Sequence, residues 1–342
     1  MKSFAFLLFF CLLASGHVLA EQSTLKIGYL TDLSEKGAFW GQQSILGAQI
    51  AAQELGIPKE NLIIVDHRSS LSIAATEAQR LLTIESVDLI LSDLTNTSAA
   101  IAPIVARYKV PMIHFSPSLE ISRVNPSAFR LFLDYGMGCE LLAKEFTKLN
   151  QQDLLIIKAN SEFGELCAKG AKKVFSSAEE IAYDSGQDLN SELLRVINSQ
   201  DFNIIQTGFE TDFVSSFKRL KQMGRRPIIG MPFLLLTKPV EIAANDLKPK
   251  QLITFGYNSD GALEFQQKLK IKTSKIDINW QAAALSYLAI QQAVQMAEEC
   301  PSKEISCRTK ALSQATQSEL LGFSGYVDRQ ASFKIQINTR TF

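Results

Sequence analysis

Short apolar runs alternate with amphipathic stretches along the first part of the chain. The apolar runs have the length and composition of buried strands: LKIGYL (25–30), NLIIVD (61–66), VDLILSD (87–93) and PMIHF (111–115). The stretches between them carry apolar side chains at helical spacing, over residues 41–55, 72–84 and 98–108. Strict alternation of strands and helices predicts an α/β fold, in which helices cover both faces of a parallel sheet.

The same rhythm restarts after a pause around residues 126–137. Strands are predicted at DLLIIKA (153–159), EEIAYD (179–184), FNIIQTG (202–208), RPIIGM (226–231) and QLITFGY (251–257). Helical spacing occupies residues 138–149, 164–176, 189–199, 211–223, 262–269 and 280–299, and FKIQIN (333–338) reads as a last strand. The sequence therefore predicts two similar α/β units, each a doubly wound parallel sheet.

The N-terminus has the features of a secretion signal. Lys2 precedes an apolar run that ends at Leu13, and Val18-Leu19-Ala20 offers a small-residue cleavage site. The run is too short for a spanning helix, which needs about 20 apolar residues. We expect cleavage after Ala20 and a periplasmic mature protein with no stable membrane insertion.

Composition and charge narrow the class of protein. The chain has 342 residues, enough for two domains, and 46% of them are hydrophobic, which is sufficient for a large core. Thirty-five basic residues balance thirty-five acidic ones. This balance argues against a nucleic-acid partner and against a polybasic patch that binds membranes.

The cysteines after the signal suggest disulfides, as expected in an exported chain. Cys300 and Cys307 bracket a short polar loop, CPSKEISC, and we predict that they are bridged, with two free thiols as the alternative. Cys139 and Cys167 lie in helical patterns, where buried free thiols fit equally well. Their pairing stays open at the level of the sequence.

Catalytic signatures are absent from the sequence. It contains no G-x-S-x-G, H-E-x-x-H, C-x-x-C or P-loop pattern. Asp66 ends a predicted strand, where a ribose-binding acid would lie, but no glycine-rich turn accompanies it. Only His67 and His114 remain after signal cleavage, which disfavours a histidine-rich metal site. We predict a protein that is not an enzyme and uses no cofactor and no metal.

Polar and aromatic residues gather where the predicted strands end. Ligands bind beyond the carboxyl ends of parallel strands in open sheets. Hydroxyls beside a helix start suit a carboxylate, and aromatic rings suit an apolar body. The residues at these ends are Phe39, Trp40, Thr95, Asn96, Thr97, Ser98, Ser116 and Ser118 in the first unit, and Phe163 and Phe209 in the second. Helix capping by Thr97 and Ser98 is the simpler alternative, but it explains only part of this set.

Five stretches in order along the chain carry a resemblance to a known family. They are LKIGYLTDLSEKGAFWGQQSILGAQIAAQEL (25–55), KVPMIHFSPS (109–118), NSEFGELCAKGAKKVF (160–175), LKQMGRRPIIG (220–230) and GFSGYVDRQASFK (322–334). Together they resemble type I periplasmic substrate-binding proteins of the branched-chain amino acid branch, the receptor components of ABC importers. The resemblance covers nearly the whole chain after the signal.

The resemblance implies two lobes that are joined by three crossovers and close on a ligand. The first lobe would comprise residues 24–130 and 258–327, and the second lobe residues 131–257 and 328–342. By position in the family, residues 95–98 with Ser116 and Ser118 would hold a ligand carboxylate. Phe39 and Trp40 would line the first lobe, and Phe163 and Phe209 would contact the ligand from the second lobe.

Three departures from the family pattern bear on the ligand. Amino-acid-binding members place an acid for the ligand ammonium soon after the strand that matches RPIIG, whereas this chain has Met231-Pro232-Phe233. His114 and Phe115 replace a small residue and a proline, and Phe163 and Phe209 lack a tyrosine hydroxyl. The fold inference is unaffected, but the pattern favours acids without an α-ammonium group over amino acids.

The sequence thus predicts a monomeric binding protein that delivers a small carboxylate-bearing solute, an amino acid or a related organic acid, to the permease of an ABC importer. One alternative is a ligand-sensing subunit for a membrane signalling receptor, because the same lobe closure serves either role. A second alternative is a nucleotide-dependent enzyme on a doubly wound sheet. Export and the missing glycine turn count against that enzyme.

Overall fold

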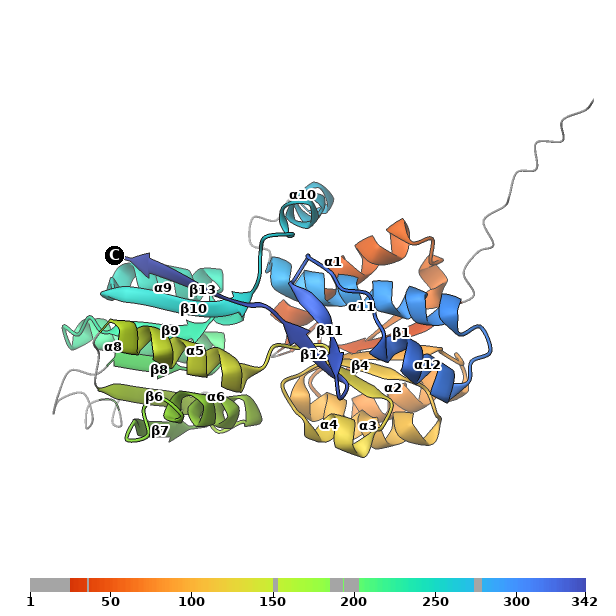
Figure 1. Cartoon of the computed structure of the whole chain (residues 1–342), viewed down its shortest axis with the longest axis horizontal. Helices are drawn as coiled ribbons and strands as arrows, with labels where there is room; N and C mark the ends of the chain where they lie inside the picture. Colours follow the sequence, from red (N-terminus) through yellow and green to blue (C-terminus); the bar gives the residue numbers. More distant parts are fainter. Residues whose placement is uncertain (1–24, 36, 150–152, 185–192, 194–202, 274–278) are drawn as a thin grey trace, which may run out of the picture.

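The computed structural model describes residues 25–35, 37–149, 153–184, 193, 203–273 and 279–342. The predicted signal and most of the predicted helix 189–199 lie outside these residues. Two lobes lie side by side, each built around its own sheet (Figure 1). Among the described helices, none has both the length and the apolarity to cross a bilayer.

The first lobe contains a seven-stranded sheet with the order β11-β12-β5-β4-β3-β1-β2. Its neighbours from β5 to β2 pair in parallel, and β11 and β12 form an antiparallel hairpin. The strands are β1 (Ile27–Thr31), β2 (Leu62–Asp66), β3 (Leu89–Asp93), β4 (Met112–Phe115), β5 (Ala128–Arg130), β11 (Phe323–Val327) and β12 (Gln330–Phe333).

Helices cover both faces of this first sheet. The helices α2 (Leu71–Thr83) and α3 (Thr95–Arg107) bury their apolar stripes against one face, with the short α4 (Glu120–Val124) beside α3. The opposite face packs against α1 (Ala38–Glu54) and α11 (Trp280–Glu299), which lie against each other. The two faces are apolar because successive strand residues point to opposite sides, as Leu89, Ile90 and Leu91 do.

The second lobe contains a six-stranded sheet with the order β13-β10-β9-β8-β6-β7. All neighbours pair in parallel except β13, which runs antiparallel to β10. The strands are β6 (Leu154–Ala159), β7 (Glu179–Tyr183), β8 (Asn203–Gln206), β9 (Ile228–Pro232), β10 (Gln251–Tyr257) and β13 (Ile335–Thr341). The helices α5 (Tyr135–Lys148) and α6 (Glu162–Lys172) cover one face, and α8 (Glu210–Gln222) and α9 (Lys238–Leu247) the other.

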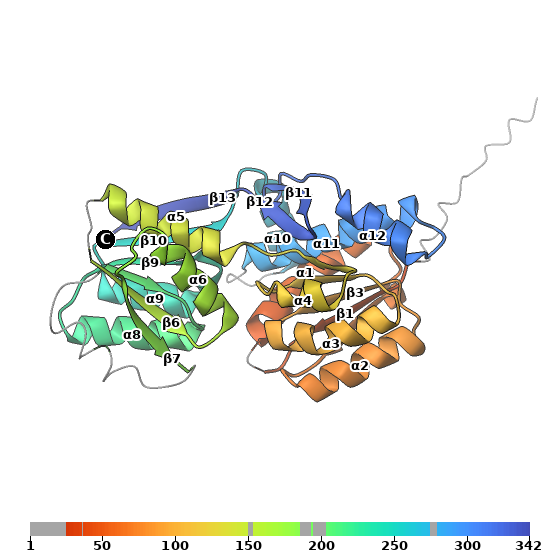
Figure 2. The ribbon, with the colours of Figure 1, turned by 60° about the horizontal axis from the view of Figure 1, so that its bottom comes forward.

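The chain passes between the sheets after β5, after β10 and after β12 (Figure 2). The helix α10 (Leu263–Lys272) follows the second of these crossings. We assigned residues 328–342 to the second lobe from the sequence, but β12 pairs with β11 and β5 in the first sheet, so the last crossing falls at Lys334. The reason is a tight hairpin turn at Asp328 and Arg329, whose positive φ angles of 48° and 61° return the chain to the first sheet.

Several short elements differ from the sequence prediction. The predicted pause at 126–137 contains β5 and the start of α5, and α9 and α12 (Ile305–Ser313) occupy stretches where the sequence pattern predicted no helix. Pro239 stands near the start of α9, where its missing N–H costs nothing, so it begins this helix and does not break it. Val240, Ala244 and Leu247 then bury one face of α9.

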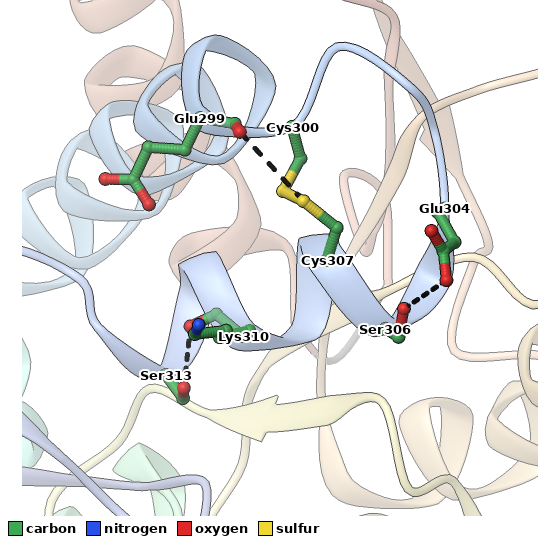
Figure 3. The surroundings of a disulfide bond; sticks show 7 residues. All are labelled: Glu299, Cys300, Glu304, Ser306, Cys307, Lys310 and Ser313. Carbon is green, nitrogen blue, oxygen red and sulfur yellow. Dashed lines mark hydrogen bonds between the residues drawn. A yellow bond between two sulfur atoms is a disulfide. The ribbon is translucent and has the colours of Figure 1, made fainter.

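Two disulfides lie in the described part of the chain. Cys300, which ends α11, is bonded to Cys307 in the first turn of α12 (Figure 3). Cys139 of α5 is bonded to Cys167 of α6, a pairing that the sequence left open. Both of these second-lobe sulfurs are fully buried, so the bond ties two neighbouring helices together inside the lobe.

Candidate ligand-binding site

The carboxyl end of the first sheet brings three of the predicted hydroxyl residues together. Thr95 starts α3, and Ser116 and Ser118 follow β4. The Ser116 hydroxyl donates to the Thr95 hydroxyl over 3.1 Å and accepts the backbone N–H of Ser118 over 3.2 Å. Asn96 is exposed beside them. This group is a small polar surface at the edge of the sheet where ligands bind in open α/β folds.

Thr97 and Ser98 are turned away from this surface. The Thr97 hydroxyl donates to the carbonyl of Asp93 over 2.9 Å, and the Ser98 hydroxyl donates to the same carbonyl over 3.0 Å. Both residues are buried, and Ser98 also contacts the Ser92 hydroxyl at 2.8 Å. These two hydroxyls therefore stabilise the turn from β3 into α3, and they do not serve as N-caps.

The first turn of α3 lacks a side-chain cap. Its N-cap residue is Leu94, which has no polar side-chain atom and is held at a φ of 57°. The helices α2, α5 and α6 differ, because Ser70, Asp134 and Ser161 accept hydrogen bonds from their first-turn N–H groups. Uncapped N–H groups and the positive end of the helix dipole attract an anion. This helix start lies at Thr95, beside Ser116.

A carboxylate shapes the loop that follows β1. Asp32 accepts the N–H groups of Glu35 and Gly37, both at 2.9 Å, and the hydroxyl of Ser69. Burial raises the pKa of Asp32, but these hydrogen bonds outweigh it and lower the pKa overall. Gly41 completes the arrangement, since a Cβ there would lie 1.9 Å from the Asp32 carbonyl. The loop thus holds the start of α1 directly against the end of β1.

The rings of Phe39 and Trp40 stand at this helix start. They contact each other edge to face, with centroids 5.1 Å apart. Trp40 packs against the core of its own lobe and also against the buried cluster around Leu155 and Phe213 in the second lobe. Trp40 therefore lies where the two lobes meet.

The second lobe repeats the pairing of an aromatic residue with glycine. Gly164 follows Phe163 at the start of α6, and a Cβ there would lie 2.2 Å from the Ala159 carbonyl at the end of β6. Phe163 meets Phe209, which precedes α8, edge to face at 5.7 Å, and Phe209 is 41% exposed. The ring centroid of Tyr135 lies 6.1 Å from that of Phe163. Sequence reasoning missed Tyr135, although its position at a predicted pause between the units was a signal.

A buried polar network lies behind the end of β3. Asp93 accepts the Thr31 hydroxyl and bonds with His67 Nε2 at 3.2 Å. The backbone N–H of Ser69 donates to His67 Nδ1, so Nε2 carries the proton in the neutral ring. Burial raises the pKa of Asp93. Because its oxygens are engaged, Asp93 is a weak candidate for the acid that would meet a ligand ammonium.

The position that suggested a nucleotide site has a structural role. Asp66 accepts the N–H of Leu33 at 3.0 Å, the hydroxyl of Ser34 at 2.7 Å and the N–H of Arg68 at 2.9 Å. The carboxylate thereby braces the same loop that Asp32 shapes. In the described ranges, no cluster of three or more His, Cys, Asp or Glu residues is arranged to hold a metal ion.

Comparison with known proteins identifies the family. The sequence matches the family described as periplasmic binding protein over residues 24–334. The chain belongs to this family. A search of curated proteins gives no significant match.

Solved structures of periplasmic binding proteins share the fold. The leucine-binding protein LivK of Thermotoga maritima superimposes with a TM-score of 0.78 at 20% identity, covering 93% of this chain and 95% of that one. LivJ of Streptococcus pneumoniae, in complex with isoleucine, superimposes with a TM-score of 0.74 at 18% identity, covering 92% of this chain and 95% of that one. A solute-binding protein of R. palustris, in complex with 4-hydroxybenzoate, gives 0.76 at 16% identity, covering 92% of each chain.

Within this periplasmic binding protein, the stretch after β9 has no acid for an ammonium group. Met231 and Pro232 end the strand, and Phe233, Leu234 and Leu235 form a short 3-10 helix. Glu162 and Glu210 begin α6 and α8, next to Phe163 and Phe209. These two acids are at the correct edge of the second sheet, but neither matches the position that the family pattern indicates.

Sequence reasoning also missed Arg130, the last residue of β5. Its side chain is buried, and Nη1 donates to the carbonyl of Pro117, between Ser116 and Ser118, over 3.1 Å. A charged residue that ends a strand inside an apolar pattern was the available signal.

Proposed function

We propose that this periplasmic binding protein closes on a small carboxylate-bearing solute and delivers it to an ABC importer. The observation that carries the proposal is the uncapped start of α3 beside the Thr95 and Ser116 hydroxyls. A carboxylate oxygen at this point accepts hydrogen bonds from the free N–H groups and from the hydroxyls. The ligand would thus cap a helix start that has no side-chain cap of its own.

The aromatic residues support an apolar body for the same ligand. Phe39 and Trp40 lie in the first turn of α1 on the first lobe, while Phe163 and Phe209 lie at the starts of α6 and α8 in the second lobe. Ligand-binding sites combine apolar walls with a few fixed polar groups. The relatives bound to isoleucine and to 4-hydroxybenzoate hold small molecules with one carboxylate and an apolar part, which agrees with this description.

Several further expectations belong to this proposal. The signal would be removed after Ala20, and the mature protein would act outside the cytoplasm as a monomer that is not an enzyme. The lobes would move as units, residues 24–130 with 258–333 against residues 131–257 with 335–342. A sensing role for the same closure is the second candidate, because lobe closure serves a signalling receptor and a permease equally.

A thermal unfolding panel tests the proposal. We expect stabilisation by benzoate, 4-hydroxybenzoate or 4-methyl-2-oxopentanoate, and a smaller effect from leucine and isoleucine, whose ammonium has no acid after β9. A ligand at about 100 times its dissociation constant adds about 2.7 kcal/mol to the free energy of unfolding. Benzamide, which lacks the carboxylate, is the control. If no acid raises the melting temperature, the carboxylate proposal is wrong, and a larger effect of leucine would contradict the predicted ranking.

A further inference from the structure

Arg130 is a buried cation without an acidic partner. Its residue is 4% exposed, and no carboxylate of the described chain lies within 4.0 Å of its guanidinium. Nη1 donates to the carbonyl of Pro117, while the buried Nε has no hydrogen-bond partner among the described residues. Taking a charge out of water without a partner costs several kcal/mol, so such a group normally has one.

The position of the guanidinium relates it to the candidate site. Pro117 lies between Ser116 and Ser118, so the bond from Nη1 places the positive charge directly under the loop that carries these hydroxyls. Burial lowers the pKa of Arg130, and the charges of Asp134 and Glu162, at the starts of α5 and α6, act in the opposite direction. Because both belong to second-lobe helices, the guanidinium lies on the side of the first lobe that faces the second.

His114, the neighbour of Arg130 in the sheet, is uncharged. His114 stands opposite Arg130 in the β4–β5 ladder and is fully buried. Burial and the charge of Arg130 lower the pKa of His114 to about 3, so the ring is neutral at physiological pH. Arginine keeps its proton at any physiological pH. The positive charge behind Ser116 and Ser118 is therefore that of Arg130.

We propose that the guanidinium of Arg130 is the countercharge of the ligand carboxylate and makes the site select acids over zwitterions. This inference rests on the proposed function. A ligand that carries only a carboxylate neutralises Arg130 and leaves no second charge to bury. A zwitterionic amino acid neutralises Arg130 equally but brings an ammonium that must find its own acid.

Three variants of two buried first-lobe arginines provide the test. Arg130→Met keeps the length of the side chain and removes its charge, and Arg130→Lys keeps the charge without the planar fork. Arg308→Met is the matched control, since Arg308 is equally buried but is paired with Asp88, with Nη2 3.0 Å from Oδ1. Binding of benzoate, 4-hydroxybenzoate, 4-methyl-2-oxopentanoate and isoleucine is measured by calorimetry, and unfolding of the ligand-free proteins by circular dichroism.

We expect substitution of Arg130 to change ligand affinity and substitution of Arg308 to change stability. Arg130→Met should weaken the best acid about 100-fold, as truncation of one partner of a buried charge pair does, and leave the ligand-free melting temperature unchanged or higher. Arg130→Lys should retain part of the affinity. Arg308→Met should lower the melting temperature, because Asp88 loses its buried partner, and leave the affinity unchanged.

Other outcomes separate the inference from the function on which it rests. If Arg130→Met binds the acid as tightly as the wild type, the inference is overturned and the proposed function stands. If the wild-type protein binds none of the acids, both are overturned. Glu162→Gln tests a different role for Arg130, a direct bond to Glu162 that holds the two lobes together. Equal losses in Glu162→Gln and Arg130→Met would show such a bond and overturn the inference, whereas unchanged or tighter binding of the acid by Glu162→Gln supports it.

Discussion

At the scale of single residues, identical side chains at neighbouring strand ends have different roles. Ser116 bonds with Thr95 at the open edge of the sheet, whereas Ser98 bonds back to the carbonyl of Asp93. The sequence predicted both as ligand contacts. The difference arises from the backbone of Leu94, whose positive φ turns the chain sharply between β3 and α3.

Ser116→Ala and Ser98→Ala should therefore separate binding from stability. Loss of the Ser116 hydroxyl removes the group that bonds with the Thr95 hydroxyl at the site, which should weaken binding of the best acid by about two- to tenfold, in line with about 0.5–1.5 kcal/mol for one hydrogen bond. Loss of the buried Ser98 hydroxyl should lower the free energy of unfolding by about 1 kcal/mol with unchanged affinity. Calorimetric titration and urea unfolding of both variants measure this. Equal effects on affinity would assign Ser98 to the site as well.

Buried His114 should make the protein sensitive to mild acid. Its pKa is lowered to about 3 in the fold, against about 6.5 in the unfolded chain. The unfolded state then binds the proton first, so the stability that the neutral ring contributes is complete above pH 6.5 and falls as the pH drops toward 3. Between pH 7 and pH 5 this group alone should lower the free energy of unfolding by about 2 kcal/mol.

The variant His114→Leu tests this account. Urea unfolding measures the free energy of unfolding at pH 7 and at pH 5. The decrease between these two pH values should be about 2 kcal/mol smaller in the variant than in the wild type. A decline of the same size in both proteins would mean that His114 does not titrate as its burial implies.

At the scale of elements, hydrophobic periodicity predicted most strands and long helices, because each buries an apolar stripe of ordinary length. It failed for α12, a short helix whose buried residues are Arg308, Ala311 and Leu312. It also failed for β11 and β12, since no glycine marks positions 328 and 329 of their hairpin turn. The carboxyl edge of the sheet was predictable as a site, but the direction of each hydroxyl and the place of Arg130 depend on tertiary contacts.

The two disulfides close loops of different length, so they should contribute different amounts to the free energy of unfolding. The sequence separations are 28 residues for Cys139–Cys167 and 7 for Cys300–Cys307. In the chain-entropy model the longer loop contributes about 3.6 kcal/mol and the shorter about 2.5 kcal/mol. Urea unfolding of the two double alanine variants should reproduce this order. Alkylation of the native, unreduced protein should leave all four cysteines unlabelled, and labelling of either pair would contradict the bridge.

At the scale of the whole molecule, the lobes are linked by the crossings after β5, β10 and β12 and touch near the starts of α1 and α11. Asn279, the N-cap of α11, donates to the carbonyl of Leu234 in the second lobe over 3.2 Å. Trp40 packs against the cores of both lobes. A link made of three crossings allows the lobes to rotate as units, which is a common route to ligand capture.

Ligand binding should therefore close the lobes and cover Trp40. Trp40 and Trp280 are the two tryptophans of the chain, so Trp280→Phe leaves Trp40 as the sole tryptophan reporter. Saturation with the best-binding acid should shift the emission of this variant to shorter wavelength, because the second lobe excludes water from the ring. The radius of gyration from small-angle scattering should fall in parallel. Trp40→Phe is the control, whose remaining Trp280 should respond less. A ligand that saturates the site while leaving both the emission and the radius unchanged would show that binding does not require closure, and Phe163 and Phe209 would then have no contact with the ligand.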